Sequence, residues 1–76
     1  MEQSRILIDP NIQHGKPVIR GTRVPITRIL EGLGGGMSIE EVVREYEVTK
    51  KDVRAALAFA GDLIDQETFY PLRKTA

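Results

Sequence analysis

Apolar residues recur at helical spacing from residue 26 onward. The first run holds four of them at positions i, i+3, i+4 and i+7: Ile26, Ile29, Leu30 and Leu33. This spacing places the apolar side chains on one side of a helix. Pro25 fits the first turn of that helix because proline has no N–H group to leave unpaired. The three glycines at residues 34–36 are predicted to end it.

Two capping signals eleven residues apart predict two more helices. Ser38 with Glu41 has the S-x-x-E pattern of a capping box, and Thr49 with Asp52 is a looser version of it. In both, a side-chain oxygen is placed to accept from the free N–H groups of a first helical turn. Two helices that begin so close together must be joined by a tight turn. Residues 38–57 are therefore predicted to form a helix-turn-helix pair.

The apolar positions of these helices predict which faces are covered. The second helix is expected to bury Ile39, Val42, Val43 and Tyr46. The third, expected to run to about residue 65, carries a first stripe of Val53, Leu57, Ala60 and Ile64. Beside it lies a second stripe of Ala56, Phe59 and Leu63. Two short helices cannot cover so wide an apolar surface. We therefore expect a dimer or partner surface made of Ala56, Phe59, Leu63 and, in the tail, Phe69 and Tyr70.

Before residue 26 the pattern predicts short extended segments. Residues 5–9 read as a strand with three apolar residues at its centre, and Asp9-Pro10-Asn11 is a turn signal. Residues 17–20 read as a second extended stretch, closed by a turn at Gly21 and Thr22. The predicted fold is mainly α, with three helices that follow a short N-terminal β element.

Length and composition add limits to this picture. The chain has 76 residues, which predicts one domain over residues 1–65 and a C-terminal tail over 66–76. A core of this size supplies only about a few kcal/mol of net stability, so a homodimer is expected. There is no cysteine and only one histidine, His14. We therefore expect no disulfide, no metal and no cofactor, and the lack of cysteine suits a cytoplasmic protein. No signal peptide, membrane span or enzyme constellation stands out.

The net charge of the chain weighs against nucleic-acid binding, and the distribution of charge along the chain weighs against it less. The net charge is zero, whereas dedicated DNA binders are usually basic. Residues 1–28 carry five basic and two acidic residues, and residues 48–76 carry five basic and four acidic ones. Residues 29–47 hold one basic and five acidic residues. An acidic segment is therefore flanked by two basic ones.

The start of the third helix holds the candidate DNA contacts. Residues there are expected to point outward: Thr49, Lys50, Lys51, Arg54 and Ala55. The three cations are suited to phosphates or guanine edges. The alternative is that they are solvated surface charges. Two features oppose DNA binding: the glutamates of the second helix repel phosphates unless they face away, and Glu47 replaces the usual turn glycine at a cost of about 1 kcal/mol.

Arg20 and Arg23 lie on either side of the tight turn at residues 21–22. Two converging guanidinium groups suit a phosphate, so this pair is a candidate clamp on the DNA backbone. The alternative is a bond within the chain, to Asp9 or to carbonyl groups of the turn.

Three segments together carry a family resemblance: D-P-N-I-Q-H-G-K-P-V-I-R-G-T-R-V-P at residues 9–25, G-M-S-I-E-E-V-V-R-E-Y, and T-K-K-D-V-R-A-A-L-A-F-A. They resemble the small prokaryotic "domain of unknown function 433" family over about residues 6–65, and the G-K-P-V-I-R-G-T-R-V-P string is the most specific part. The resemblance implies a homeodomain-like three-helix fold and an antitoxin-like, VapB-type role beside a PIN-like ribonuclease toxin. The chain departs from the family at Gly34 and Gly35, where helix formers are usual.

Two functional hypotheses follow from the sequence. The first is an antitoxin-like regulator that binds double-stranded operator DNA as a homodimer and neutralises a ribonuclease toxin. The second is a protein-interaction module that binds a partner and no DNA. The two can hold together, because an antitoxin can perform both tasks.

Overall fold

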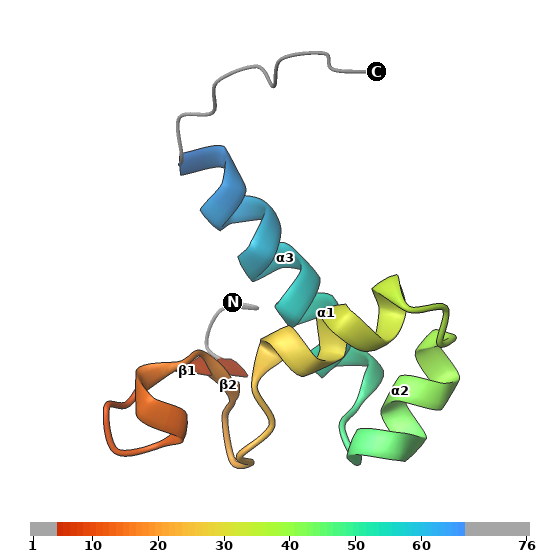
Figure 1. Ribbon diagram of the computed structural model, residues 1–76, viewed down its shortest axis with the longest axis horizontal. Helices are drawn as coiled ribbons and strands as arrows, with labels where there is room; N and C mark the ends of the chain where they lie inside the picture. Colours follow the sequence, from red (N-terminus) through yellow and green to blue (C-terminus); the bar gives the residue numbers. More distant parts are fainter. Residues whose placement is uncertain (1–4, 67–76) are drawn as a thin grey trace, which may run out of the picture.

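The computed structural model describes residues 5–66 and contains three helices and a two-stranded antiparallel sheet. The elements in chain order are β1 (Ile6–Leu7), the 3-10 turn η2 (Gln13–Gly15), β2 (Val18–Ile19), α1 (Ile26–Gly34), α2 (Ile39–Tyr46) and α3 (Lys50–Gln66), shown in Figure 1. The mainly helical fold with a short N-terminal β element, expected from the sequence, is confirmed. Phe69 and Tyr70 lie outside the described residues.

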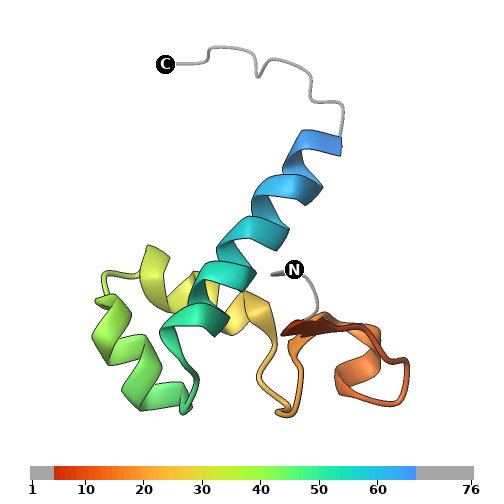
Figure 2. The ribbon, with the colours of Figure 1, turned by 180° about the vertical axis from the view of Figure 1, so that it is seen from behind.

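The N-terminal sheet pairs Ile6 with Ile19 and Leu7 with Val18. The turn after β1 is closed by the Asp9 carboxylate, which accepts from the Asn11 N–H at 2.8 Å, as the turn signal predicts. Figures 1 and 2 show the sheet and α2 at opposite ends of the domain, with α1 and α3 between them. The sheet therefore closes the end of the core that α2 does not reach.

The first helix begins and ends where the sequence predicts. Pro25 is its N-cap, and Gly35 is its C-cap, with an N–H that donates to the carbonyl of Glu31. Gly36 follows with φ of +107°, a conformation that side-chain-bearing residues rarely adopt. The glycine run therefore ends α1 and turns the chain toward α2.

The core lies where α1, α2, α3 and the sheet meet. Its buried apolar residues come from all four elements and the turn after α2: Ile6, Ile19, Ile26, Ile29, Val42, Val48, Val53, Ala55 and Ala56. Around them pack half-buried side chains, among them Val43, Tyr46 and Phe59. Ile39 is 42 % exposed, so the prediction that it is buried with α2's other apolar residues is wrong.

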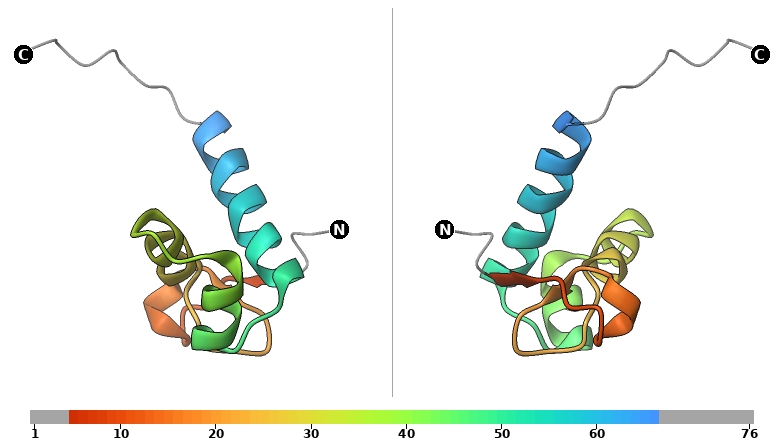
Figure 3. Two further views of the ribbon diagram at one scale, coloured as in Figure 1. Left: turned by 90° about the vertical axis from the view of Figure 1, so that its right-hand side faces the viewer. Right: turned by 90° about the vertical axis from the view of Figure 1, so that its left-hand side faces the viewer.

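The third helix begins in the core and then leaves it. Figures 1 and 3 show its C-terminal half projecting away from the other elements. Val53 and Ala56 are buried, whereas Leu57, Leu63 and Ile64 are 45 %, 49 % and 58 % exposed. Both predicted stripes therefore start buried and end in solvent, because α3 is longer than the domain against which it packs.

Candidate nucleic-acid interface

Both capping boxes form completely. In α2, Ser38 Oγ accepts from the Glu41 N–H at 3.1 Å, and Glu41 Oε1 accepts from the Ser38 N–H at 2.7 Å. In α3, Thr49 Oγ1 accepts from the Asp52 N–H at 3.0 Å, and Asp52 Oδ2 accepts from the Thr49 N–H at 2.9 Å. The second box, looser by its sequence, is thus as complete as the first. Each box fixes the residue at which its helix begins.

The turn between α2 and α3 is as tight as the sequence predicts. Glu47 adopts the left-handed conformation, with φ of 57° and ψ of 46°, and its N–H donates to the carbonyl of Val43. Val48 then enters the core, where only 6 % of it is exposed. One strained residue and one buried apolar residue therefore reverse the chain and set the angle at which α3 leaves α2.

Asp52 joins the start of α3 to the N-terminal strand. Asp52 is only 7 % exposed, and its Oδ1 accepts a hydrogen bond from Arg5 Nη1 at 3.2 Å. One carboxylate oxygen thus caps the N-terminus of α3, and the other binds the Arg5 cation. Sequence reasoning missed the role of Arg5, because a capping pattern identifies Asp52 and nothing in it points to a partner 47 positions away. This ion pair therefore links the residue that precedes β1 to the start of the candidate DNA-binding helix.

The predicted DNA contacts on α3 are solvent-exposed with one exception. Thr49, Lys50, Lys51 and Arg54 are all exposed, over the first two turns of the helix. Ala55, expected to point outward with them, has 0 % exposure because it packs into the core, so that prediction is wrong.

The four exposed side chains differ in their charge partners. Lys50 Nζ lies 3.9 Å from Glu40 Oε2 of α2, with 62 % and 70 % of the two side chains exposed. Pairs this exposed contribute little to stability because solvent screens them. Within residues 5–66, Lys51 and Arg54 make no ion pair. Their cationic groups are therefore the ones most available for an anionic ligand.

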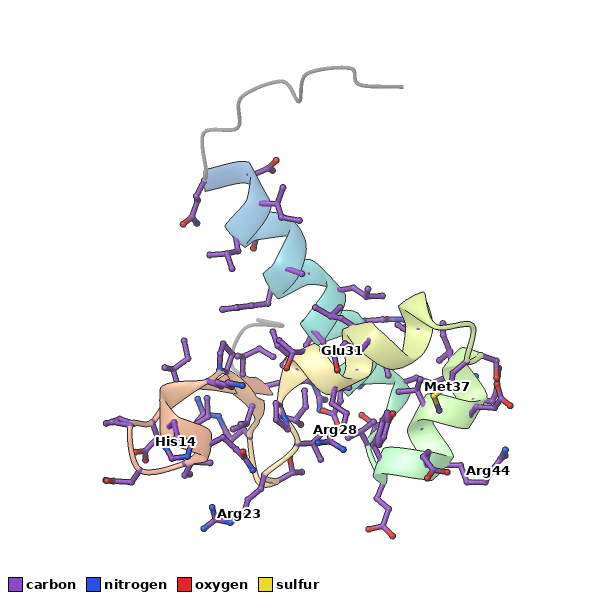
Figure 4. All side chains as sticks on the ribbon, viewed as in Figure 1. His14, Arg23, Arg28, Glu31, Met37 and Arg44 are labelled. Atoms are coloured by element: carbon purple, nitrogen blue, oxygen red, sulfur yellow. The ribbon has the colours of Figure 1, made fainter. Side chains whose placement is uncertain are left out.

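Within residues 5–66, Arg20 makes a hydrogen bond through its side chain, whereas Arg23 makes one only through its carbonyl. Arg20 Nη2 donates to the carbonyl of Ile6 at 3.4 Å, while Asp9, the partner suggested by the sequence, accepts from Asn11 instead. Arg23 uses its carbonyl to accept from Gln13 Nε2 at 3.2 Å, and its side chain points away from the domain in Figure 4. The loop that carries Arg23 and the α2–α3 turn reach the same end of the molecule in Figures 1 to 3.

The predicted partner surface on α3 is smaller than expected. Ala56 has 0 % exposure and belongs to the core, so it cannot line a partner surface and that prediction is wrong. Phe59 is half-buried against the core, and Leu63 is exposed. These two line an open depression with Asp62 and Gln66. What remains of the predicted surface in the described residues is thus Phe59 and Leu63.

Two classes of feature are absent from the described part of the chain. Among residues 5–66 there is no cluster of three or more histidine or acidic residues that is arranged to hold a metal ion. No helix within the same residues has the length and the apolar character needed to cross a membrane.

Two solved structures are similar to this chain. One is a DUF433 member protein from Anabaena variabilis, with 28 % identity over 84 % of this chain and a TM-score of 0.76. The other is Rv2018 from Mycobacterium tuberculosis, with 33 % identity over 68 % of this chain and a TM-score of 0.63. The chain spans 64 % of the first protein's length and 24 % of the second's. No curated protein matches it.

The family model described as "Protein of unknown function (DUF433)" matches residues 6–60, which include every element up to the middle of α3. This range contains both capping boxes and the left-handed turn at Glu47. It also contains Asp52, the ion-pair partner of Arg5. The chain therefore belongs to the DUF433 family.

Proposed function

We propose that this protein is an antitoxin-like regulator that binds operator DNA as a homodimer in the cytoplasm and neutralises a PIN-like ribonuclease toxin. The observation that carries the DNA-binding part is the α2–turn–α3 unit, with its left-handed turn at Glu47 and cations at the start of α3. In helix-turn-helix proteins the second helix of such a pair enters the major groove with its N-terminal residues.

The first two turns of α3 suit this docking chemically. The exposed side chains there are the hydroxyl of Thr49, just before α3, and the three cations Lys50, Lys51 and Arg54 within it. The helix N-terminus adds partial positive charge beside them, which favours phosphate. Arg23, on the loop at the same end of the molecule, points away from the domain (Figure 4) and adds one more cation for the DNA backbone. Arg20 supports that loop through its bond to the Ile6 carbonyl.

The toxin-binding part rests on the apolar side of α3 beyond the core. Phe59 and Leu63 lie one helical turn apart and border the same open depression. Apolar helix faces of this kind dock into grooves of partner proteins through residues at helical spacing. Phe69 and Tyr70, which the sequence also assigns to the partner surface, lie outside the described residues.

DNA binding is tested by titrating the purified full-length chain into a labelled duplex from upstream of its own reading frame. Lys51→Glu is expected to weaken binding by about tenfold or more, because it removes one phosphate or base contact and introduces repulsion. Lys16→Glu is the matched control: it changes net charge equally at an exposed site away from α3 and should leave affinity nearly unchanged. Binding should also weaken steeply with salt. Equal loss in both variants, or no binding by the wild type at low salt, contradicts the proposal.

The alternative function is a protein-interaction module that binds no DNA. Zero net charge favours it, as does the Lys50–Glu40 pair, which partly neutralises one of the candidate contacts. Co-purification with the product of the adjacent reading frame tests this function. Leu63→Glu should abolish co-purification, whereas Lys51→Glu should leave it unchanged. A chain that co-purifies with the partner and never shifts DNA would favour this alternative over the regulator.

A further inference from the structure

The projecting half of α3 has a second apolar surface that neither the core nor the proposed toxin contact uses. Leu57, Gly61 and Ile64 follow each other at i, i+4 and i+7, so they lie on one side of the helix. Leu57 and Ile64 are 45 % and 58 % exposed, and a Cβ added at Gly61 would meet no atom within 4 Å. We call these three residues the α3 ridge. Leu63, by helical geometry, points to a different side.

Charge along α3 indicates what covers the ridge. Exposed cations occupy the first part of the helix, where Lys50 and Arg54 lie, and exposed carboxylates occupy the last part, with Asp65 near its end. A second copy of the same helix, placed antiparallel, meets each half with the opposite charge. A parallel copy meets each half with like charge, which is unfavourable. Among arrangements of two copies, the antiparallel one is therefore complementary.

We propose that the α3 ridge is the homodimer contact, with two copies of α3 packed antiparallel about a two-fold axis near Gly61. In this arrangement Leu57 of one protomer lies against Ile64 of its partner. Arg54 and Asp65, eleven residues apart on the same flank of the ridge, then form two ion pairs related by the two-fold axis, so that Lys50 and Lys51 remain the α3 cations offered to DNA in the dimer. Gly61 has no packing role within its own chain and lets the two helix backbones approach each other closely.

The geometry of this dimer also suits the proposed function. This spacing argument rests on the proposed DNA binding, whereas the dimer contact itself does not. Each α3 rises about 1.5 Å per residue, so the two Lys50 positions lie roughly 32 Å apart along the paired helices. Successive major grooves of B-DNA on one face are about 34 Å apart. The antiparallel pair therefore separates the two candidate DNA-binding ends by nearly one turn of the duplex.

The contact is tested on the full-length chain without DNA, by sedimentation equilibrium. Ile64→Glu is expected to raise the dimer dissociation constant about tenfold or more, because it places a charge in the apolar contact with Leu57 of the partner protomer. Leu63→Glu introduces the same charge one position away and should change that constant less than about threefold. Circular dichroism verifies that both variants keep their helices. Equal effects of the two variants, or a monomeric wild type, overturn the proposal.

The direction of pairing is tested separately by cross-linking and charge exchange. The chain has no cysteine, so Leu57→Cys and Ile64→Cys chains can be mixed and oxidised. An antiparallel pair yields the mixed disulfide, and predominance of either self-linked product overturns it. Arg54→Glu and Asp65→Lys should each weaken the dimer, and the double variant should restore it. A chain ending at Gln66 should still dimerise; loss of its dimer would assign the contact to the tail and overturn the proposal.

These outcomes are separable from those of the DNA-binding test. If Lys51→Glu fails to affect DNA binding, the regulator proposal falls while the dimer measurements stand. If Ile64→Glu fails to affect dimerisation, the α3 ridge falls, and DNA binding remains measurable with the wild-type chain.

Discussion

Asp52 is the residue on which the placement of α3 most depends. Its carboxylate accepts from the Thr49 N–H at the helix start and from Arg5 in the segment that precedes β1. It is almost fully buried, so both partners are needed to offset the cost of removing a carboxylate from water. The cap is readable in the sequence; the ion pair with Arg5 is not, because it depends on the sheet lying against α3.

Replacing Asp52 should therefore destabilise the whole domain. Asp52→Ala removes a cap and leaves Arg5 without its carboxylate, at an expected cost of about 2 kcal/mol in the free energy of unfolding. Urea denaturation followed by circular dichroism measures it. Glu45→Ala, at an exposed position of α2, should change stability by less than about 0.5 kcal/mol. Comparable losses in the two variants would contradict the role assigned to Asp52.

Glu47 shows a local strain that the sequence predicts and the structure confirms. Its φ of 57° is unfavourable for a residue with a Cβ. Glu47→Gly should therefore raise the free energy of unfolding by about 1 kcal/mol. Glu45→Gly, inside α2, should lower it by about the same amount, because glycine weakens a helix interior. Thermal unfolding of both variants checks the opposite signs; a destabilised Glu47→Gly chain would argue against the turn.

At the scale of the elements, the start of α2 is set by local chemistry in its capping box. Hydrogen bonds from the Ser38 backbone and side chain lower the pKa of the Glu41 carboxyl below its ordinary value of 4.5. Because folding lowers the pKa of the Glu41 carboxyl, its charged form stabilises the folded state at pH values above 4.5. This contribution is lost as pH falls through the folded pKa.

The Glu41 cap should therefore give a pH-dependent stability difference. At neutral pH, Glu41→Ala is expected to unfold at lower denaturant concentration than the wild type. The difference should shrink as pH falls below 4.5, because the wild-type carboxyl then takes up a proton. Denaturant titrations of both chains across this range measure the trend. A difference that stays constant with pH would show that the charge of Glu41 does not stabilise α2.

The third helix shows where sequence periodicity stops predicting burial. Its spacing correctly predicted a long amphipathic helix, but Ala55 was expected in solvent and Ala56 on a partner surface, and the structure buries both. Periodicity gives the relative directions of side chains around a helix. It gives neither the absolute orientation of the helix nor the residue at which the packed domain ends, and α3 extends beyond that point.

At the scale of the whole molecule, the distribution of charge matters more than its sum. The net charge is zero, yet the cations of α3 and the glutamates of α2 lie on adjacent elements. Glu40 is the acid that reaches the candidate interface, through its contact of 3.9 Å with Lys50. Its carboxylate is therefore the acidic group expected to oppose the approach of a phosphate.

Removing that carboxylate should strengthen the proposed DNA binding. Glu40→Gln releases Lys50 and removes one repulsive charge, with an expected gain in affinity of about two- to fivefold. Glu31→Gln, which makes the same change of net charge at an exposed site on α1, should have little effect. Fluorescence anisotropy at low salt measures both variants. An unchanged or lower affinity for Glu40→Gln would place the DNA contact elsewhere.

By itself, the sequence determined the features that depend on near neighbours. Both capping boxes, the left-handed turn at Glu47 and the glycine end of α1 arise from hydrogen bonds and backbone preferences within a few residues. The tertiary structure alone decided the Arg5–Asp52 pair, the burial of Ala56 and the exposure of Leu57 and Ile64. Each of these depends on how distant segments pack together, and a local pattern carries no information on the position where one packed element stops covering another.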